Sequence, residues 1–229
     1  MGLGGELARE VPRRTRGLGP ALLVSVALGI GCGGGDGKGA SPSDLKPLLL
    51  PAGSFPVKVQ RTFEWRNPTD FVAQGLSLPD STEPSQAIAA IDRAGFEAAA
   101  GQLLAPAVVD LTAYSEVAKF DSDSGASKAL EDLHAQDLLR PCLSCGVIAR
   151  PLVVSGIPNA KGAHQAPMAA KAPPSGAGQP FERYVVEFTI GPYLFVGKVT
   201  GQPGLVPTAL FTGGMKSFYE YARKHSQQG

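Results

Sequence analysis

The sequence predicts an α+β domain in which an antiparallel sheet carries helices packed on one face. Residues 183–200 alternate apolar and polar side chains on either side of the turn pair Gly191-Pro192, which is the pattern of a β-hairpin. Residues 121–138 and 213–225 repeat apolar side chains at helical spacing. Strand-like and helical segments do not alternate regularly along the chain, so we expect an antiparallel rather than a parallel sheet.

The first half of the domain is predicted to begin with a strand and a short helix. Residues 57–63 alternate at period two, as a half-buried strand does. Residues 84–94 carry a proline near the start and apolar residues on one stripe, and Gly95 is placed just after the end of this helix. Residues 96–100 are expected to add a further helical turn, and residues 107–120 to form one long strand or two short ones.

The second half contains clearer helical patterns. The sequence Asp-Ser-Asp-Ser offers N-cap residues for the helix at 121–138, which is expected to end before Pro141. Residues 142–155 hold two short strand-like runs, and the Ala-, Pro- and Gly-rich residues 156–180 are expected to form an exposed loop. The last helix, at 213–225, carries one face of core residues: Met215, Phe218, Tyr219 and Ala222.

The N-terminal region is typical of a bacterial secretory signal. Four arginines lie in the first 16 residues, and the apolar run at 18–31 is shorter than the roughly 20 residues that a membrane-spanning helix needs. We therefore divide the chain into a signal peptide at 1–31, a flexible Gly/Ser-rich tether at 32–44 and a single domain at 45–229. The alternative is an uncleaved signal anchor that contains an incidental cysteine.

The junction Leu28-Gly29-Ile30-Gly31-Cys32 resembles the lipobox of bacterial lipoproteins. Members of that family usually have Leu three residues before the cysteine, where this sequence has Gly29. The resemblance implies that the peptide is cut before Cys32 and that the cysteine sulfur receives an acyl chain such as palmitate. The mature protein is then expected on the outer, extracytoplasmic face of the cell membrane, held there by its lipid anchor.

Charge and composition restrict the partners of the domain. The chain has 229 residues, with 21 Lys and Arg against 20 Asp and Glu. No cluster of basic residues follows the signal peptide, so we expect no nucleic-acid partner, because such a partner requires many phosphates to be neutralised. The partners that remain are the membrane, a small or lipidic ligand, and another protein of the cell envelope.

Cys142 and Cys145 form a Cys-Leu-Ser-Cys pair in a domain that is expected to be exported. Thiols outside the cytoplasm are usually oxidised, so a disulfide that closes a small loop is predicted. The alternative is a thiol–disulfide redox module that uses the same two cysteines. Pro141 precedes the pair and no aromatic residue does, which favours the structural disulfide.

Other candidate sites fit their motifs less well. Zinc could be bound by Cys142 and Cys145 together with His134 and either His164 or His225, but a structural zinc site usually shows two close ligand pairs. Residues 121–132 match a calcium loop only in part, since Gly and Ala stand where an acid and Gly are required. We therefore expect no metal, no cofactor and no catalytic residue. The three histidines, His134, His164 and His225, are expected to be surface residues.

Three segments resemble parts of uncharacterised actinobacterial-type surface lipoproteins: Phe120–Ala126, Gly156–Gly162 and Tyr184–Gly191. The order of strand, helix and cysteines is also similar to that in the extracellular sensor domains of bacterial receptor kinases. The resemblance covers residues 107–200 and implies no activity. With the signal peptide, it indicates a lipid-anchored binding or sensor-like domain for an unidentified ligand rather than an enzyme.

Overall fold

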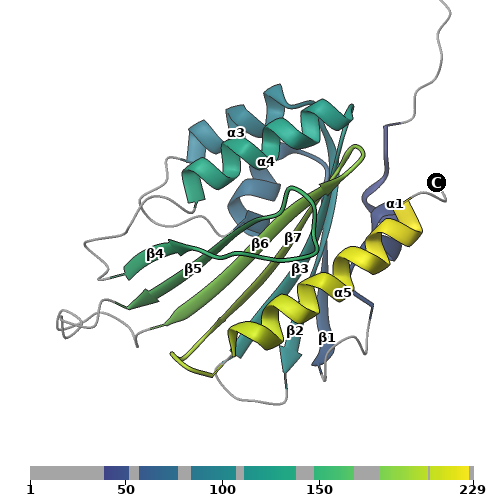
Figure 1. Ribbon diagram of the computed structural model, residues 1–229. Coiled ribbons are helices and arrows are strands. Elements are labelled where there is room, and N and C mark those ends of the chain that lie inside the picture. Colours follow the sequence, from purple (N-terminus) through teal and green to yellow (C-terminus); the bar gives the residue numbers. More distant parts are fainter. Residues whose placement is uncertain are drawn as a thin grey trace, which may run out of the picture. The chain divides into compact units, whose positions relative to one another are not determined.

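An antiparallel sheet forms the centre of the domain in the computed structural model (Figure 1). The structure describes residues 39–51, 57–76, 84–106, 111–137, 147–167, 181–205 and 207–226. Within these residues, seven strands form one sheet in the order β1-β2-β3-β7-β6-β5-β4. The strands are β1 Val57–Trp65, β2 Phe96–Pro106, β3 Leu111–Phe120, β4 Val147–Pro151, β5 Lys161–Pro167, β6 Glu182–Ile190 and β7 Tyr193–Gly201.

Every neighbouring pair of strands in this sheet is antiparallel. The predicted hairpin is confirmed as β6 and β7, in which Ile190 pairs with Tyr193. Gly191 in the turn has a φ of 56°, a left-handed conformation that glycine adopts without a Cβ clash. Strand β7 then pairs with β3, which joins the hairpin to the meander of β1, β2 and β3.

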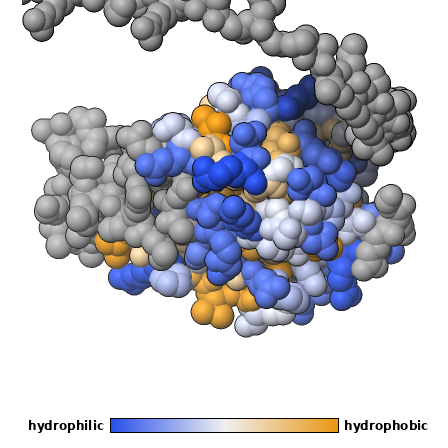
Figure 2. Space-filling view, turned by 90° about the horizontal axis from the view of Figure 1, so that it is seen from above, coloured by the Kyte–Doolittle hydropathy of each residue, from blue (hydrophilic) through white to orange (hydrophobic). Residues whose placement is uncertain are grey.

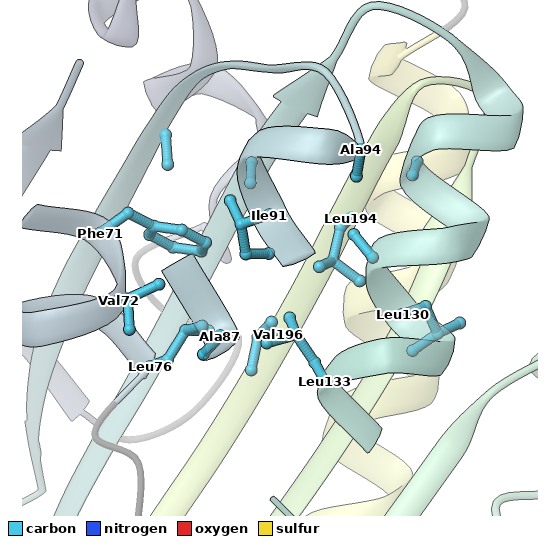
Figure 3. Close-up of a cluster of buried hydrophobic side chains, with 14 of the residues drawn as sticks. Phe71, Val72, Leu76, Ala87, Ile91, Ala94, Leu130, Leu133, Leu194 and Val196 are labelled. Atoms are coloured by element: carbon cyan, nitrogen blue, oxygen red, sulfur yellow. The ribbon is translucent and has the colours of Figure 1, made fainter. Parts of the chain in front are cut away.

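One face of the sheet is covered by three helices and a π-helical turn. These elements are α2 Pro68–Asp70, the π-helical turn η2 Phe71–Leu76, α3 Pro84–Arg93 and α4 Asp123–Asp137. Figure 3 shows Leu194 and Val196 of β7 pointing toward this layer, where Ile91 of α3 and Leu133 of α4 meet them. All four side chains are buried, and they form part of the first core of the domain.

The opposite face is covered by the C-terminal helix and by the segment before β1. These elements are α1 Pro42–Leu45, the 3-10 turn η1 Lys46–Leu48 and α5 Thr208–Ser226. The α+β class and the antiparallel sheet are confirmed, but helices lie on both faces of the sheet and not on one (Figure 1). Both faces need a cover because the central strands are apolar on both sides: in β6, Val185 belongs to the first core and Val186 to the second.

The helix boundaries follow the predicted caps. Helix α4 begins after Ser122, whose side-chain oxygen accepts a hydrogen bond from the backbone N of Gly125 at 3.1 Å. Helix α3 ends shortly before Gly95, which has the left-handed φ of 79° expected of a C-terminal cap. Helix α5 begins earlier than predicted, so Phe211 also joins its buried stripe.

Residues 96–100 belong to β2 and do not form the predicted helical turn. This strand lies between the two covered faces, and its small side chains leave room for the residues packed on each side. The closest approach is at Gly101, where an added Cβ would come within 2.7 Å of the Trp65 ring. Tertiary packing on both faces therefore overrides the helical preference of the alanine run.

Two predicted boundaries also change. Residues 161–167 form β5 inside the segment 156–180 that was expected to be a loop, and residues 168–180 lie outside the described part of the chain. Ala163 of this strand is buried in the first core, and Gly162 lies against Leu152 and Val154 on the other side. The tether predicted at 32–44 must end before Pro42, because α1 begins there and buries Leu45.

The face of the domain seen from above in Figure 2 is mainly hydrophilic, with hydrophobic residues in small separate groups. The exposed large hydrophobic residues of the described chain come from different elements and loops: Val59, Val153, Phe181, Leu205 and Leu210. A ligand or partner that approaches this face would therefore meet mainly polar side chains.

Candidate functional site: a polar pocket beside α4

A pocket of about 320 Å³ lies between α4, the end of the β4–β5 connection and the neighbouring strands β5 and β6. Its size is within the range of small-molecule sites. Most of the lining residues are polar, and Leu130 and Ala160 supply the apolar part. The lining consists of Ser127, Leu130, Glu131, Asn159, Ala160, Lys161 and Thr189.

The β4–β5 connection brings Asn159 to the pocket by a tight turn. Asn159 has a φ of 56°, and among the described residues it is the one non-glycine with a left-handed backbone. Asparagine tolerates this conformation better than most residues. The turn is fixed by Ile157, which is buried in the second core and whose carbonyl accepts a hydrogen bond from the N of Ala160 at 3.4 Å.

An ion pair closes one side of the pocket. Lys161 Nζ at the start of β5 lies 3.0 Å from Glu131 Oε1 on α4, and the Glu131 side chain is 64% exposed. Exposed pairs of this kind contribute about 0.2–1 kcal/mol. A ligand can therefore separate the two charges at little cost, and the pair leaves the rim of the pocket without net charge.

Three other lining side chains have polar atoms available to a ligand. Within the described residues, the hydroxyls of Ser127 and Thr189 and the carboxamide of Asn159 make no hydrogen bond to the protein. They come from a helix, a strand and a turn, which the fold brings to one place. Convergent polar groups fix the orientation of a ligand in small-molecule sites, and here they make up most of the lining.

His134 and Glu187 lie one helical turn beyond the pocket. His134 Nδ1 is 3.9 Å from Glu187 Oε2, and the Glu187 side chain is almost completely buried. Burial lowers the pKa of His134, the Lys161 ammonium lowers it further, and Glu131 opposes this effect. The imidazole is therefore favoured in its neutral form beside the pocket.

A second polar cluster lies at the opposite end of the sheet and fastens the start of α5. Glu182 accepts hydrogen bonds from the Tyr184 hydroxyl at 2.9 Å and from the N of Gly204 at 2.7 Å, and it contacts His164 Nε2 at 2.6 Å. Burial acts to raise the pKa of Glu182, but these three contacts outweigh it and hold the pKa below its usual value. The cluster stabilises the connection between β7 and α5.

A third polar group is enclosed in the first core. Lys198 Nζ on β7 lies 2.8 Å from Glu116 Oε1 on β3 and also donates a hydrogen bond to the carbonyl of Gly75 in η2. Burial raises the pKa of Glu116, and the Lys198 ammonium opposes this effect. Both side chains are at most 5% exposed, so this pair links the sheet to η2 and offers no surface to a ligand.

The predicted site residues have different outcomes. Cys32, Cys142 and Cys145 lie outside the described residues, so lipidation, the disulfide and the alternative redox pair stay predictions. Among the residues that the structure describes, no three His, Cys, Asp or Glu side chains lie close enough to hold a metal ion. His164 contacts Glu182, and His225 Nδ1 bonds to the carbonyl of Tyr221 at 2.7 Å.

No residue of the pocket was predicted from the sequence as a site residue. The segment Gly156–Gly162, which contains Asn159 and Lys161, was singled out only for its resemblance to other proteins. A Pro-Asn pair in a glycine-flanked segment is a turn signal, but it does not reveal which helix the turn approaches.

In the described chain, no helix is long and apolar enough to cross a membrane.

Comparison with known proteins gives a likeness of fold. No protein-family model and no curated protein matches the sequence. The structure is similar to the extracellular domain of PknH from Mycobacterium tuberculosis, with a TM-score of 0.51 and 12% identity over 82% of this chain and 99% of that chain. A putative uncharacterized protein (Rv0999 ortholog) from Mycobacterium smegmatis matches with a TM-score of 0.39 and 12% identity over 79% of this chain and 94% of that chain. At this identity the first likeness shows a shared fold, and the second is too distant to support an argument.

Proposed function

We propose that this chain is an extracytoplasmic ligand-binding domain without catalytic activity, held on the outer face of the cell membrane by an acyl chain on Cys32. The observation that carries the proposal is the fold shared with an extracellular domain along 99% of that domain's length. The N-terminal sequence supports the same location, since a basic start and a short apolar run precede Cys32.

The polar pocket beside α4 supports a role in binding. Its hydroxyl and carboxamide groups have no hydrogen-bond partner among the described residues, and its ion pair can open at small cost. Ser127 and Asn159 are exposed, so a ligand from solution can reach these groups directly. In a sensor-like domain, such binding would be the event that the domain detects.

Fractionation of cells that express the full chain tests the proposal. We expect the wild type in the detergent-soluble membrane fraction, with an intact mass that lacks residues 1–31 and includes acyl chains. Cys32→Ala should keep residues 1–31 and carry no acyl chain, whereas Ser43→Ala, a control beyond the junction, should behave as the wild type does. Equal masses for the wild type and Cys32→Ala would show that the lipoprotein assignment is wrong.

A further inference from the structure

The pocket lies at the end of the sheet where the described chain begins. The backbone N of Ala40 donates to Glu97 Oε2 at 3.3 Å, near the start of β2. The N of Phe120 at the end of β3 donates to the Pro192 carbonyl in the β6–β7 turn at 2.9 Å. Thr189 of the pocket lies just before that turn, and Figure 1 shows the turn, the start of α4 and α1 on the same side.

Under the proposed function, this end of the sheet is the one tethered to the membrane. Only seven residues lie between Cys32 and Ala40, and the chain from one to the other spans at most about 30 Å. Strand β2 alone has 11 residues and is about 37 Å long, so the other end of the sheet can lie that much farther from the anchor. The pocket is therefore within reach of groups that project from the bilayer.

The chemistry of the lining selects a neutral, hydroxyl-rich group. Lys161 and Glu131 cancel each other's charge, and the uncommitted polar atoms of the lining can both donate and accept hydrogen bonds. Leu130 and Ala160 are too small an apolar surface to enclose an acyl chain. A sugar or polyol satisfies these groups, and a phosphate would lie against the Glu131 carboxylate.

We propose that the pocket binds the neutral, sugar-like headgroup of a glycolipid in the membrane that carries the protein. The proposal rests on the proposed function, because the lipid anchor is what brings this end of the domain to the bilayer. The apolar part of the glycolipid stays in the membrane while its hydroxyls bond to Ser127, Thr189 and Asn159. A free sugar has the same chemistry, so the experiment must separate the two sources.

The test uses the full lipidated protein in phosphatidylcholine vesicles and measures the acetylation rate of Lys161 by mass spectrometry. Lys128, exposed on α4 and outside the lining, is the internal reference. Monogalactosyl diacylglycerol is added to the same vesicles, to separate vesicles, or replaced by soluble methyl β-galactoside. Binding slows Lys161 by a factor of one plus the ratio of ligand concentration to Kd, so a ninefold excess over Kd gives about tenfold protection.

We expect protection when the galactolipid shares the protein's bilayer, and little from separate vesicles or from the free sugar at the same total concentration. Asn159→Gly keeps the left-handed backbone but removes the carboxamide, and it should raise Kd up to about tenfold, as Ser127→Ala should. Ser217→Ala, on the opposite face of the domain, should leave protection unchanged.

Several results would overturn the proposal. Equal protection by phosphatidylglycerol would identify an anion site. Equal protection by the free sugar or by separate vesicles would show that binding does not depend on the bilayer that carries the protein. Full protection in Asn159→Gly and Ser127→Ala would place the ligand elsewhere. Loss of the protein from floated vesicles would contradict the lipid anchor instead, and methyl β-galactoside would then decide the pocket chemistry alone.

Discussion

The least ordinary residues of this domain are the two charges in its first core. Glu116 and Lys198 come from neighbouring strands, and Lys198 also faces the ring of Tyr114 at 5.3 Å from the ring centre. Removing such charges from water costs several kcal/mol per ion, which their attraction and hydrogen bonds offset only when the geometry is good. The pair therefore specifies the position of η2 over the sheet more than it adds to stability.

Substitutions of this ion pair should show strong coupling. Glu116→Leu leaves the ammonium buried without its carboxylate, and Lys198→Met leaves the carboxylate without its ammonium, so each should lower the free energy of unfolding by about 3–5 kcal/mol. The double variant should be close to the wild type or more stable, because neither charge is left alone. Urea denaturation at neutral pH measures all three. A double variant that loses the sum of the single effects would contradict this account.

Glu182 should make the stability of the domain depend on pH. Its pKa in the folded state is below the ordinary value of 4.5, so its contribution is present above that value and is lost as the pH falls through the folded-state pKa. We expect Glu182→Gln to lower the free energy of unfolding by about 1–2 kcal/mol at pH 7, with the difference shrinking in acid. Glu131→Gln, in the exposed pair, should change it by at most about 1 kcal/mol. A difference for Glu182→Gln that stays constant with pH would show that the hydrogen bonds do not act through its charge.

At the scale of the elements, short sequence motifs predicted the ends of helices, because those ends are determined by a few neighbouring residues. Ser122 and Gly95 mark helix ends because their roles need only a cap oxygen or a left-handed backbone. The alanines of β2 carry no such signal, and their strand forms because neighbours on both sides pair with it and both faces are covered. The prediction that helices cover only one face of the sheet was wrong for the same reason, since an apolar residue does not reveal which helix will cover it.

The pocket could not be predicted because its residues are distant in the sequence. Ser127 and Glu131 are on α4, Asn159 and Lys161 flank the start of β5, and Thr189 is at the end of β6. Each of them alone is an ordinary surface residue. Only the packing of α4 over β6 and β7 brings them together.

Two helical glycines should respond to alanine in opposite ways. A Cβ at Gly125 in α4 would be 2.2 Å from the carbonyl oxygen of Ala94, a backbone atom that cannot move alone, so Gly125→Ala should cost about 1–3 kcal/mol. A Cβ at Gly213 in α5 meets nothing within 4 Å, so Gly213→Ala should add up to about 1 kcal/mol through helix propensity. Thermal unfolding of both variants measures the shifts. An unchanged unfolding temperature in Gly125→Ala would mean that α3 and α4 can separate without loss of packing.

At the scale of the whole molecule, the domain has two cores that share one sheet. The second core needs the segment before β1 as well as α5. The Leu50 N donates to Ser115 Oγ at 3.1 Å, and Gln102 Nε2 donates to the Leu50 carbonyl at 2.6 Å, which fixes this segment across the middle of the sheet. The Tyr221 hydroxyl of α5 donates to the Pro47 carbonyl at 2.8 Å, so the two covering elements also hold each other.

Truncation should therefore show where the folded domain begins. A chain that starts at Gly39 keeps every described element, and we expect the unfolding temperature of the full chain. A chain that starts at Pro51 loses four leucines that are at most 7% exposed, each of which contributes about 1.5–3 kcal/mol: Leu45, Leu48, Leu49 and Leu50. Because a whole domain is stable by only about 5–15 kcal/mol, this form should aggregate or be digested rapidly by protease. If it folds with an unchanged unfolding temperature, the segment before β1 does not stabilise the fold. The tether from Cys32 would then extend beyond Ala40, and the pocket could lie farther from the anchor.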